Sequence, residues 1–381
     1  MLKITKYKVI NELPNPFLFD DGRTVKTVED WKLRKKEIYK YAVDLQFGGM
    51  PPEPEFLDVI CLNKGKSHST YKIYTGTREK PISFLCKMIM PVGIKRPIII
   101  SGDMCAGYFM KEDYINKALD KNIGWLLFDR TEIASDIGNN KKMGQIFETY
   151  PNLSFGVLSA WAWAYLRVVD ALEKLSLSSI NLKCIAITGH SRGGKAALLA
   201  GAVDERIAIV NPNEACLCGG GCYRIEMEAK YNESNLWRSE TLSDIWKNSS
   251  SWIGQDMERY IGRVQELPFD THYLKGMVAP RILFVSEATG DIWANPIGSW
   301  MTTMACGEIY KLLNKKENLY WYFRDGFHYH KAEDIEMLVN IISHLSDGEK
   351  INESFYNLPF EEQKLIYGWK FDNEKEDKSN E

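Results

Sequence analysis

The sequence predicts an α/β protein with a mostly parallel central sheet and helices on both of its faces. The main observation is an alternation of short β-branched runs with longer helical patterns, which is typical of parallel strands joined by crossover helices. A second observation is the segment CIAITGHSRGGK at residues 184–195, where a strand-like run leads through a glycine-flanked serine into a helix-forming run. The 381 residues, 45% of them hydrophobic, are also enough to bury one large core.

The first part of the chain, residues 1–55, is expected to form an N-terminal arm. Turn-forming residues at 13–16 are followed by TVED at 27–30, which resembles a capping box and predicts a helix that ends near Lys40. Prolines within residues 51–54 then exclude a continued helix. The arm therefore precedes the sheet rather than belonging to it.

Strand and helix patterns fill the remainder of the chain. Three strand-like runs predict antiparallel opening strands, at residues 56–62, 71–75 and 82–90. The alternating part then has strands at 97–101, 125–128, 184–188, 207–210, 281–286 and 320–323, and helices at 112–121, 159–175, 194–203, 300–313 and 333–345.

A polar, tryptophan-containing segment at 225–267 interrupts this alternation and is expected to form a cap-like insertion. A single domain over residues 1–371 follows, with a charged tail at 372–381 that is expected to be disordered.

The charge balance argues against a nucleic-acid partner. The net charge is −3, from 48 basic and 51 acidic residues, so no basic field exists to attract phosphates. No run reaches the apolar length of a membrane span, and the first residues lack the apolar core of a signal peptide. We expect no membrane association and a cytoplasmic location, or secretion if the natural N-terminus is longer. The eight cysteines are expected to be free thiols.

A G-x-S-x-G pentapeptide, residues 189–193, predicts a serine nucleophile at Ser191. A nucleophilic serine needs a sharp strand-to-helix turn that raises its hydroxyl above the sheet edge, and glycines on both sides keep neighbouring atoms away. The alternative is an ordinary turn with a surface serine. The flanking strand-like and helix-forming runs favour the nucleophile.

Three strand ends after Ser191 carry titratable side chains: Glu214, Asp291 and His328. The order serine, acid, histidine is that of the α/β-hydrolases. Serine needs an imidazole to take its proton, and the imidazole needs a carboxylate to fix its tautomer. Two acids compete for that role, each otherwise a loop-capping carboxylate, and His330 competes with His328 as the base.

Three more residues are candidates for contacts with a substrate. The amide of Arg192, at a helix N-terminus, is expected to face a developing oxyanion, and its guanidinium could add a charged donor, unless it forms a structural ion pair. Lys195, four residues after Ser191, lies on the same helical face and is expected either to donate to a sugar oxygen or to be solvated. Trp293 offers an indole suited to a sugar ring, or else packs in the core.

Cysteines at positions 216, 218 and 222 form C-x-C-x3-C without a second cysteine or histidine pair at a familiar spacing. They are expected to pack beside glycines rather than to bind a metal. The sequence predicts no metal and no cofactor.

Ordered motifs along nearly the whole chain resemble those of the glucuronoyl esterases, carbohydrate esterase family fifteen. They are LPNPFLFDDGRTVKTVEDW, SAWAWAYLRVVDAL, GHSRGGKAAL, NPNEACLCGGGCYR, LPFDTHYL, APRILFV and GDIWANP. The resemblance implies an α/β-hydrolase fold and a serine esterase that acts through an acyl-enzyme on 4-O-methyl-glucuronoyl esters of plant-derived saccharides.

The resemblance also implies roles for individual residues. These are Ser191 as nucleophile, the Arg192 side chain as oxyanion donor, Glu214 as acid with Asp291 as well or instead, His328 as base, and Lys195, Trp293 and Glu240 as sugar contacts. We expect Glu214 to contribute more to turnover than Asp291.

The chain departs from the family at two places. Many members carry a cysteine before the nucleophile that forms a disulfide with the histidine loop; here His190 stands there and Lys331 follows His330. Around the acid, Glu214 is followed by ACLC rather than by serine and glycine. The alternatives are therefore a broader carboxylesterase or acetyl esterase on the same triad, or a non-catalytic carbohydrate-binding member. A cytoplasmic enzyme would act on an imported uronate ester or a small oligosaccharide.

Overall fold

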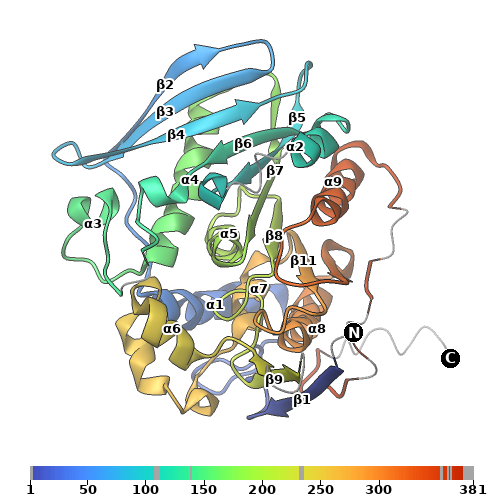
Figure 1. The fold of residues 1–381 in the computed structure, drawn as a ribbon. Helices are drawn as coiled ribbons and strands as arrows, with labels where there is room; N and C mark the ends of the chain where they lie inside the picture. Colours follow the sequence, from blue (N-terminus) through green and yellow to red (C-terminus); the bar gives the residue numbers. More distant parts are fainter. Residues whose placement is uncertain are drawn as a thin grey trace.

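The computed structural model describes residues 3–106, 112–137, 140–230, 236–351, 355–357, 360 and 363–371. The tail expected at 372–381 lies outside the described residues. Within the described part, the central sheet has the strand order β12-β11-β8-β7-β5-β6-β4-β3-β2 (Figure 1). Its strands are β2 (Phe56–Lys64), β3 (His68–Gly76), β4 (Pro81–Ile89), β5 (Arg96–Ser101), β6 (Gly124–Phe128), β7 (Ile180–His190), β8 (Ile209–Asn213), β11 (Ile282–Ala288) and β12 (Leu319–Arg324).

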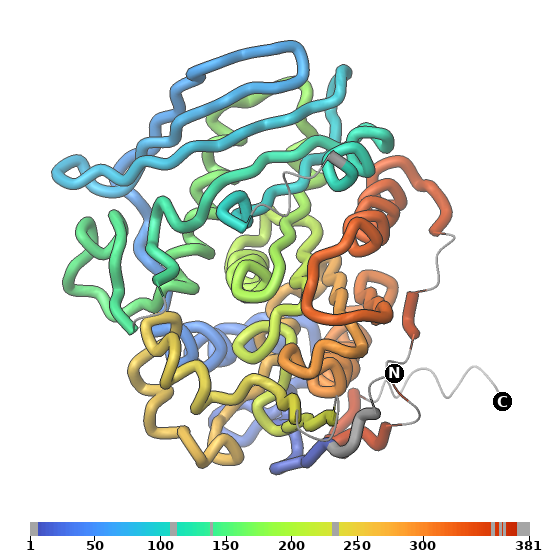
Figure 2. The backbone as a smooth tube through the Cα atoms, viewed as in Figure 1, coloured from blue at the N-terminus to red at the C-terminus, as the bar shows by residue number. Residues whose placement is uncertain are grey.

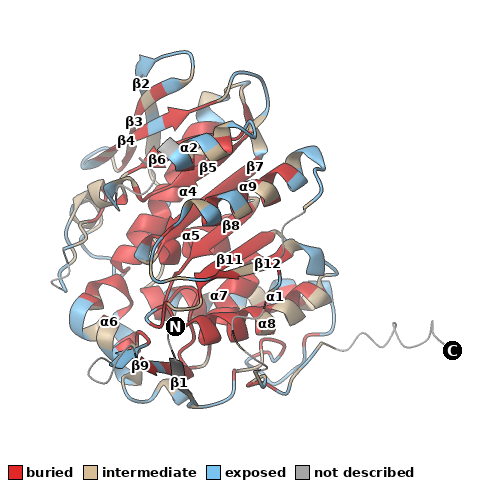
Figure 3. Cartoon of the chain, turned by 45° about the vertical axis from the view of Figure 1, so that its right-hand side comes forward, coloured by how far each residue is buried: buried red, intermediate tan, exposed pale blue. Residues whose placement is uncertain are grey.

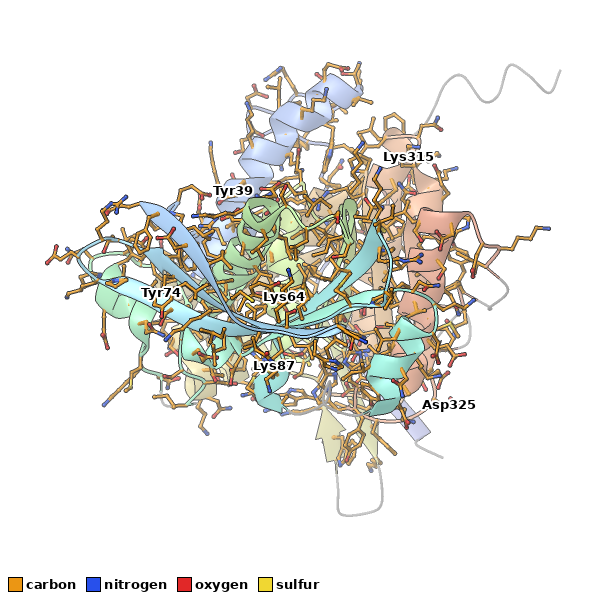
Figure 4. The ribbon with its side chains drawn as sticks, turned by 90° about the horizontal axis from the view of Figure 1, so that it is seen from above. Tyr39, Lys64, Tyr74, Lys87, Lys315 and Asp325 are labelled. Atoms are coloured by element: carbon orange, nitrogen blue, oxygen red, sulfur yellow. The ribbon has the colours of Figure 1, made fainter. Side chains whose placement is uncertain are left out.

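The sheet has a parallel part and an antiparallel part. Strands β5, β6, β7, β8, β11 and β12 pair in parallel, whereas β2, β3 and β4 pair antiparallel, as does β4 with β6. Figure 4 views the antiparallel strands from above, with Lys64, Tyr74 and Lys87 labelled on them. The predicted α/β class, with antiparallel opening strands before a parallel sheet, is confirmed.

Helices cover both faces of the sheet. The described helices are α1 (Val28–Tyr39), α2 (Glu112–Leu119), α3 (Gln145–Thr149), α4 (Val157–Leu175), α5 (Arg192–Val203), α6 (Leu242–Ser249), α7 (Thr271–Val278), α8 (Pro296–Leu312) and α9 (Ala332–Asp347). Helices α4, α5 and α7 share the largest apolar cluster with one face, and α2 and α9 pack on the other. Figure 3 shows the central strands together with α4 and α5 as buried, whereas the edge strand β2 is largely exposed.

Strand β7 is apolar at successive positions because the sheet is covered on both faces. Ile185 and Ile187 belong to the apolar cluster of α4 and α5, whereas Cys184 and Ala186 belong to that of α2 and α9. Because successive side chains of a strand point to opposite faces, a strand covered by helices on both sides must be apolar throughout. The continuous apolar run before the serine follows from this position.

The N-terminal arm and the inserted segment are joined by a small sheet that the sequence did not predict. Strand β1 (Lys3–Val9) pairs antiparallel with β9 (Ile225–Lys230), which also pairs with β10 (Leu236–Arg238). The arm and the insertion, far apart in sequence, therefore lie side by side (Figure 2). Lysines interrupt the short apolar pattern of β1, so the periodicity of the sequence alone did not identify this strand.

The capping box expected at the start of the arm's helix is present. The Thr27 side chain accepts from the Asp30 amide, and the Asp30 side chain accepts from the Thr27 amide. The helix continues as a π-helical turn, Lys40–Leu45, before the prolines. None of the helices in the described part is both long enough and apolar enough to cross a membrane.

Candidate active site

Ser191 stands on a sharp turn between β7 and α5. Its backbone dihedrals are φ 56° and ψ −122°, a sparsely populated conformation for a residue with a side chain. A Cβ on Gly193 would overlap Asp103 Oδ1, and one on Gly189 would overlap the carbonyl oxygen of Gly193. Both positions of the pentapeptide therefore require glycine, because neighbouring atoms leave no room for a side chain. The turn has the form of a nucleophile elbow.

Replacing Gly193 by alanine is expected to destabilise the elbow. The new methyl group would overlap the buried Asp103 carboxylate, which also accepts a 2.7 Å hydrogen bond from the His190 amide. Overpacking of this kind costs about 1–3 kcal/mol of unfolding free energy. Thermal unfolding should show a lower melting temperature together with reduced ester turnover. Gly368→Ala is the matched control, because no atom lies within 4 Å of the position that its methyl group would take; an unchanged Gly193→Ala protein would contradict the steric argument.

The serine opens onto a cleft that contains three of the expected site residues. Ser191, Arg192 and His328 line one cavity of about 440 Å³, together with Asp103, Arg130 and other polar side chains. Ser191 comes from the end of β7, and His328 comes from the loop after β12. The structure thus gathers the expected nucleophile and base at the carboxyl edge of the sheet, where open α/β proteins place their sites.

The imidazole of His328 contacts both candidate acids. Its Nδ1 lies 2.5 Å from Asp291 Oδ2 and 3.4 Å from Glu214 Oε2. The His328 side chain is 34% exposed, whereas the two carboxylates are buried. A partly exposed imidazole held from behind by a buried carboxylate is the arrangement that a general base needs.

His330 occupies a different environment. It is buried, and its ring packs against His190 at 5.7 Å between centroids and against Tyr114 at 6.1 Å. Burial lowers the pKa of His330 well below its ordinary value. The geometry therefore favours His328 over His330 as the base.

The two acids differ in their partners. Glu214 Oε1 accepts from the Arg324 guanidinium, and Glu214 is completely buried. Burial, followed by the charge of Asp291, raises the pKa of Glu214 well above its ordinary value. Asp291 makes the short bond to the imidazole and also accepts from the Ala294 amide at 3.2 Å. The geometry favours Asp291 as the direct partner of His328, which reverses the ranking expected from the sequence.

His190, the residue before the nucleophile, forms part of the support for the base. Its Nδ1 donates to Asn213 Oδ1 at 2.7 Å, because the amide nitrogen of Asn213 is bound to Ser286. Burial, followed by the electrostatic interaction with the neighbouring His328, lowers the pKa of His190 to about 3. Its ring lies 4.6 Å from that of His328. A neutral imidazole therefore packs against the base at the position of the family's cysteine.

Arg192 extends along the rim of the cleft. Its Nη1 is 3.0 Å from Asp136 Oδ1, and its guanidinium carbon lies 5.0 Å from the ring centre of Trp252. Asp136 is 3.8 Å from Arg130, which forms an ion pair with the buried Asp103. Arg192 therefore forms the structural ion pair that was expected from the sequence as an alternative role for its guanidinium. Its role as an oxyanion donor stays a prediction, supported by the position of Arg192 at the start of α5.

The expected sugar contacts form a second group, whose members are not among the residues that line the cavity of Ser191. Lys195 is buried rather than solvated: its Nζ donates to Glu240 Oε2 at 2.6 Å and to the Leu217 carbonyl. Trp293 is 39% exposed, so the core alternative is wrong for it. The Glu240 amide donates to the Trp293 carbonyl at 3.0 Å. These contacts join the three residues, although the Lys195 ammonium is already occupied by protein oxygens.

Sequence reasoning missed two charged residues of the centre, Asp103 and Arg324. Asp103 follows the first parallel strand, in the place where a glycine-rich oxyanion loop would stand. Arg324 is the last residue of β12, directly before the histidine loop. A charged residue at the end of an apolar strand-like run is the signal in the sequence that could have identified both.

Three acceptor atoms in the centre are close enough to share a cation. Among the described residues, His190, Glu214 and His328 each offer a ligand atom, and these atoms lie within 4.8 Å of one another. In the structure, each of these side chains is held by a protein partner: Asn213, Arg324 and Asp291, respectively. The absence of a metal requirement stays a prediction. The C-x-C-x3-C cysteines are buried free thiols.

Comparisons with known proteins agree with one another. The family model described as "Glucuronyl esterase, fungi" matches residues 73–314. The 4-O-methyl-glucuronoyl methylesterase of Schizophyllum commune is 30% identical over 312 residues, covering 80% of this chain and 75% of the relative. Podospora anserina has a 4-O-methyl-glucuronoyl methylesterase that is 32% identical over 298 residues, covering 77% of this chain and 58% of the relative.

A solved structure extends the likeness to most of the chain. The glucuronoyl esterase from Caldicellulosiruptor kristjansonii superposes with a TM-score of 0.84 at 26% identity, covering 95% of this chain and 98% of that chain. The family match, the level of identity and this shared fold establish that the chain belongs to the glucuronoyl esterases, carbohydrate esterase family 15, and is a serine carboxylic ester hydrolase.

Proposed function

We propose that this chain hydrolyses esters of 4-O-methyl-glucuronic acid through an acyl-enzyme formed on Ser191. The observation that supports this most directly is the 2.5 Å contact of His328 Nδ1 with Asp291 Oδ2, on the same cleft as Ser191. The curated relatives are named for this activity. Residues, geometry and relatives therefore support one reaction.

In the proposed first step, His328 takes the Ser191 hydroxyl proton while Oγ attacks the ester carbonyl carbon. The carbonyl π-electrons move to oxygen, and the backbone N–H of Arg192 at the start of α5, with its guanidinium, stabilises that oxyanion. The Asp291 carboxylate stabilises the imidazolium that forms. Collapse of the intermediate releases the alcohol, which takes its proton from His328.

The second step reverses these roles on water. His328 removes a proton from a water molecule, whose oxygen attacks the acyl carbon. Collapse restores the Ser191 hydroxyl with the proton from His328 and frees the uronic acid. The exposed indole of Trp293 offers a face for the sugar ring, as such residues do at carbohydrate sites.

The substrate is tested by comparing two ester classes on the same enzyme. Each kcat/KM is divided by the rate constant for uncatalysed hydrolysis of the same ester. We expect the resulting value for methyl and benzyl glucuronate to exceed that for 4-nitrophenyl acetate by at least about tenfold, since only the uronate uses the sugar contacts. A tenfold ratio corresponds to about 1.4 kcal/mol of transition-state binding. Initial rates at several substrate concentrations measure it. Equal or greater efficiency on the acetate would instead support a broader carboxylesterase or acetyl esterase.

A further inference from the structure

Arg324 lies at the junction between β12 and the loop that carries His328. Its guanidinium group is almost completely buried, with a side-chain exposure of 1%. Nε lies 3.0 Å from each carboxylate oxygen of Asp334, and Nη2 donates to Glu214 Oε1. One buried guanidinium therefore binds an acid of α9 and an acid of the catalytic centre.

The same guanidinium also binds the backbone of the histidine loop at both ends. Nη1 donates to the Asp325 carbonyl at 3.3 Å, and Nη2 donates to the Tyr329 carbonyl. These two carbonyls precede and follow His328 in the chain. Segment 319–331 contains no cysteine, so noncovalent contacts hold the loop.

Arg324 also accounts for the different positions of the two acids. Glu214 Oε1 is bound to the guanidinium, and the other oxygen stands 3.4 Å from His328 Nδ1. Asp291, which shares no hydrogen bond with Arg324 in the described part of the chain, reaches Nδ1 at 2.5 Å. Without Arg324, the buried Glu214 and Asp334 would each lose a charged hydrogen-bond partner.

We propose that Arg324 is the positioning residue of this catalytic centre: it fixes the loop on both sides of His328 and retains Glu214, so that Asp291 carries the imidazole. The proposal rests on the assignment of His328 as the base in the proposed function. Arg324 acts through His328 and is not itself expected to touch the substrate.

The test is Arg324→Lys, which keeps the charge but removes the planar group that binds several oxygens at once. We expect kcat to fall about 10- to 100-fold, because small displacements of a base have effects of this size. KM should stay within about twofold, since the proposed sugar contacts are unchanged. Thermal unfolding and circular dichroism give the folded fraction to which kcat is normalised.

Arg224→Lys provides the matched control. Arg224 is equally buried and binds a carboxylate and carbonyls in the same manner, but its partners are Asp270, Phe269 and Leu267 rather than Glu214 and the loop of His328. It should lower the melting temperature while leaving kcat per folded molecule within about twofold. An Arg324→Lys enzyme that keeps wild-type kcat, or one that changes only KM, overturns the proposal.

Asp334→Asn decides the question if Arg324→Lys does not fold. It weakens the anchor of Arg324 on α9 without altering Ser191, His328 or either candidate acid. A lower kcat with unchanged KM supports the proposal, and an unchanged kcat overturns it. All variants are assayed on 4-nitrophenyl acetate as well as methyl glucuronate. A wild-type enzyme inactive on glucuronate refutes the proposed substrate, while the acetate assay still tests Arg324.

Discussion

Replacing Ser191 by alanine is expected to lower kcat for ester hydrolysis by about 10⁴- to 10⁶-fold, the range seen when a serine nucleophile is removed. Ser191 sits at φ 56° on the elbow with its side chain on the cleft shared with His328. No other hydroxyl is placed on such a turn next to an imidazole within the described cleft lining. Turnover of methyl glucuronate and of 4-nitrophenyl acetate should be lost together.

The fold should survive this change. Alanine keeps the Cβ that already occupies the elbow, and the serine amide retains its 2.9 Å bond to the Asn213 carbonyl. Melting temperatures of the two proteins should therefore agree to within about 2 °C, the effect of a fraction of a kcal/mol. Covalent labelling by a fluorophosphonate should disappear in the variant. Residual turnover above about one hundredth of wild type, a far larger remainder than other serine enzymes retain, would place the nucleophile elsewhere.

The parallel sheet was predictable because its strands are covered on both faces. Buried strands such as β7 must be apolar at every position, so they stand out in the sequence between helical patterns. Their bounds were less accurate where polar residues extend a strand into the site. Strand β8 runs to Asn213, three residues beyond the predicted end, since Asn213 is needed to bind His190 and Ser286.

The short edge elements were not predictable from local pattern. Strands β1, β9 and β10 form only because the arm and the insertion meet, and α7 has just eight residues. Their formation depends on tertiary contacts that no window of sequence contains. The cytoplasmic location and the single-domain organisation stay predictions.

For the site, the order of the motifs in the sequence indicated which residue types meet, but not which of them form hydrogen bonds with one another. Ser191 and His328 were identified by motif and by strand ends, and they do line one cleft. The choice between Glu214 and Asp291 depended on Arg324, a residue without a recognisable motif. Hydrogen-bond competition among buried charges is a three-dimensional property, so only the structure separates the two acids.

Replacing Asp291 by asparagine is expected to reduce kcat by about 10³- to 10⁴-fold, the effect of giving a catalytic histidine the wrong tautomer. Asparagine keeps the size of the side chain, but its amide nitrogen can face His328 Nδ1 and leave that nitrogen without a proton to donate. The imidazolium formed in the transition state would also lose the carboxylate 2.5 Å away. KM for methyl glucuronate should change little, because the cleft rim and Trp293 are untouched.

The loss of kcat in Asp291→Asn is to be compared with the loss in Glu214→Gln, the same type of change at the other candidate acid. Burial and the charge of Asp291 raise the pKa of Glu214, which favours a neutral acid that glutamine resembles in shape. The amide oxygen can still accept from Arg324, so we expect kcat to fall by about tenfold or less, which corresponds to about 1.4 kcal/mol or less. Steady-state kinetics of both variants over a range of pH measure the two losses. If Glu214→Gln loses more than Asp291→Asn, the direct partner of the imidazole during turnover is Glu214, and the 2.5 Å contact describes only the resting enzyme.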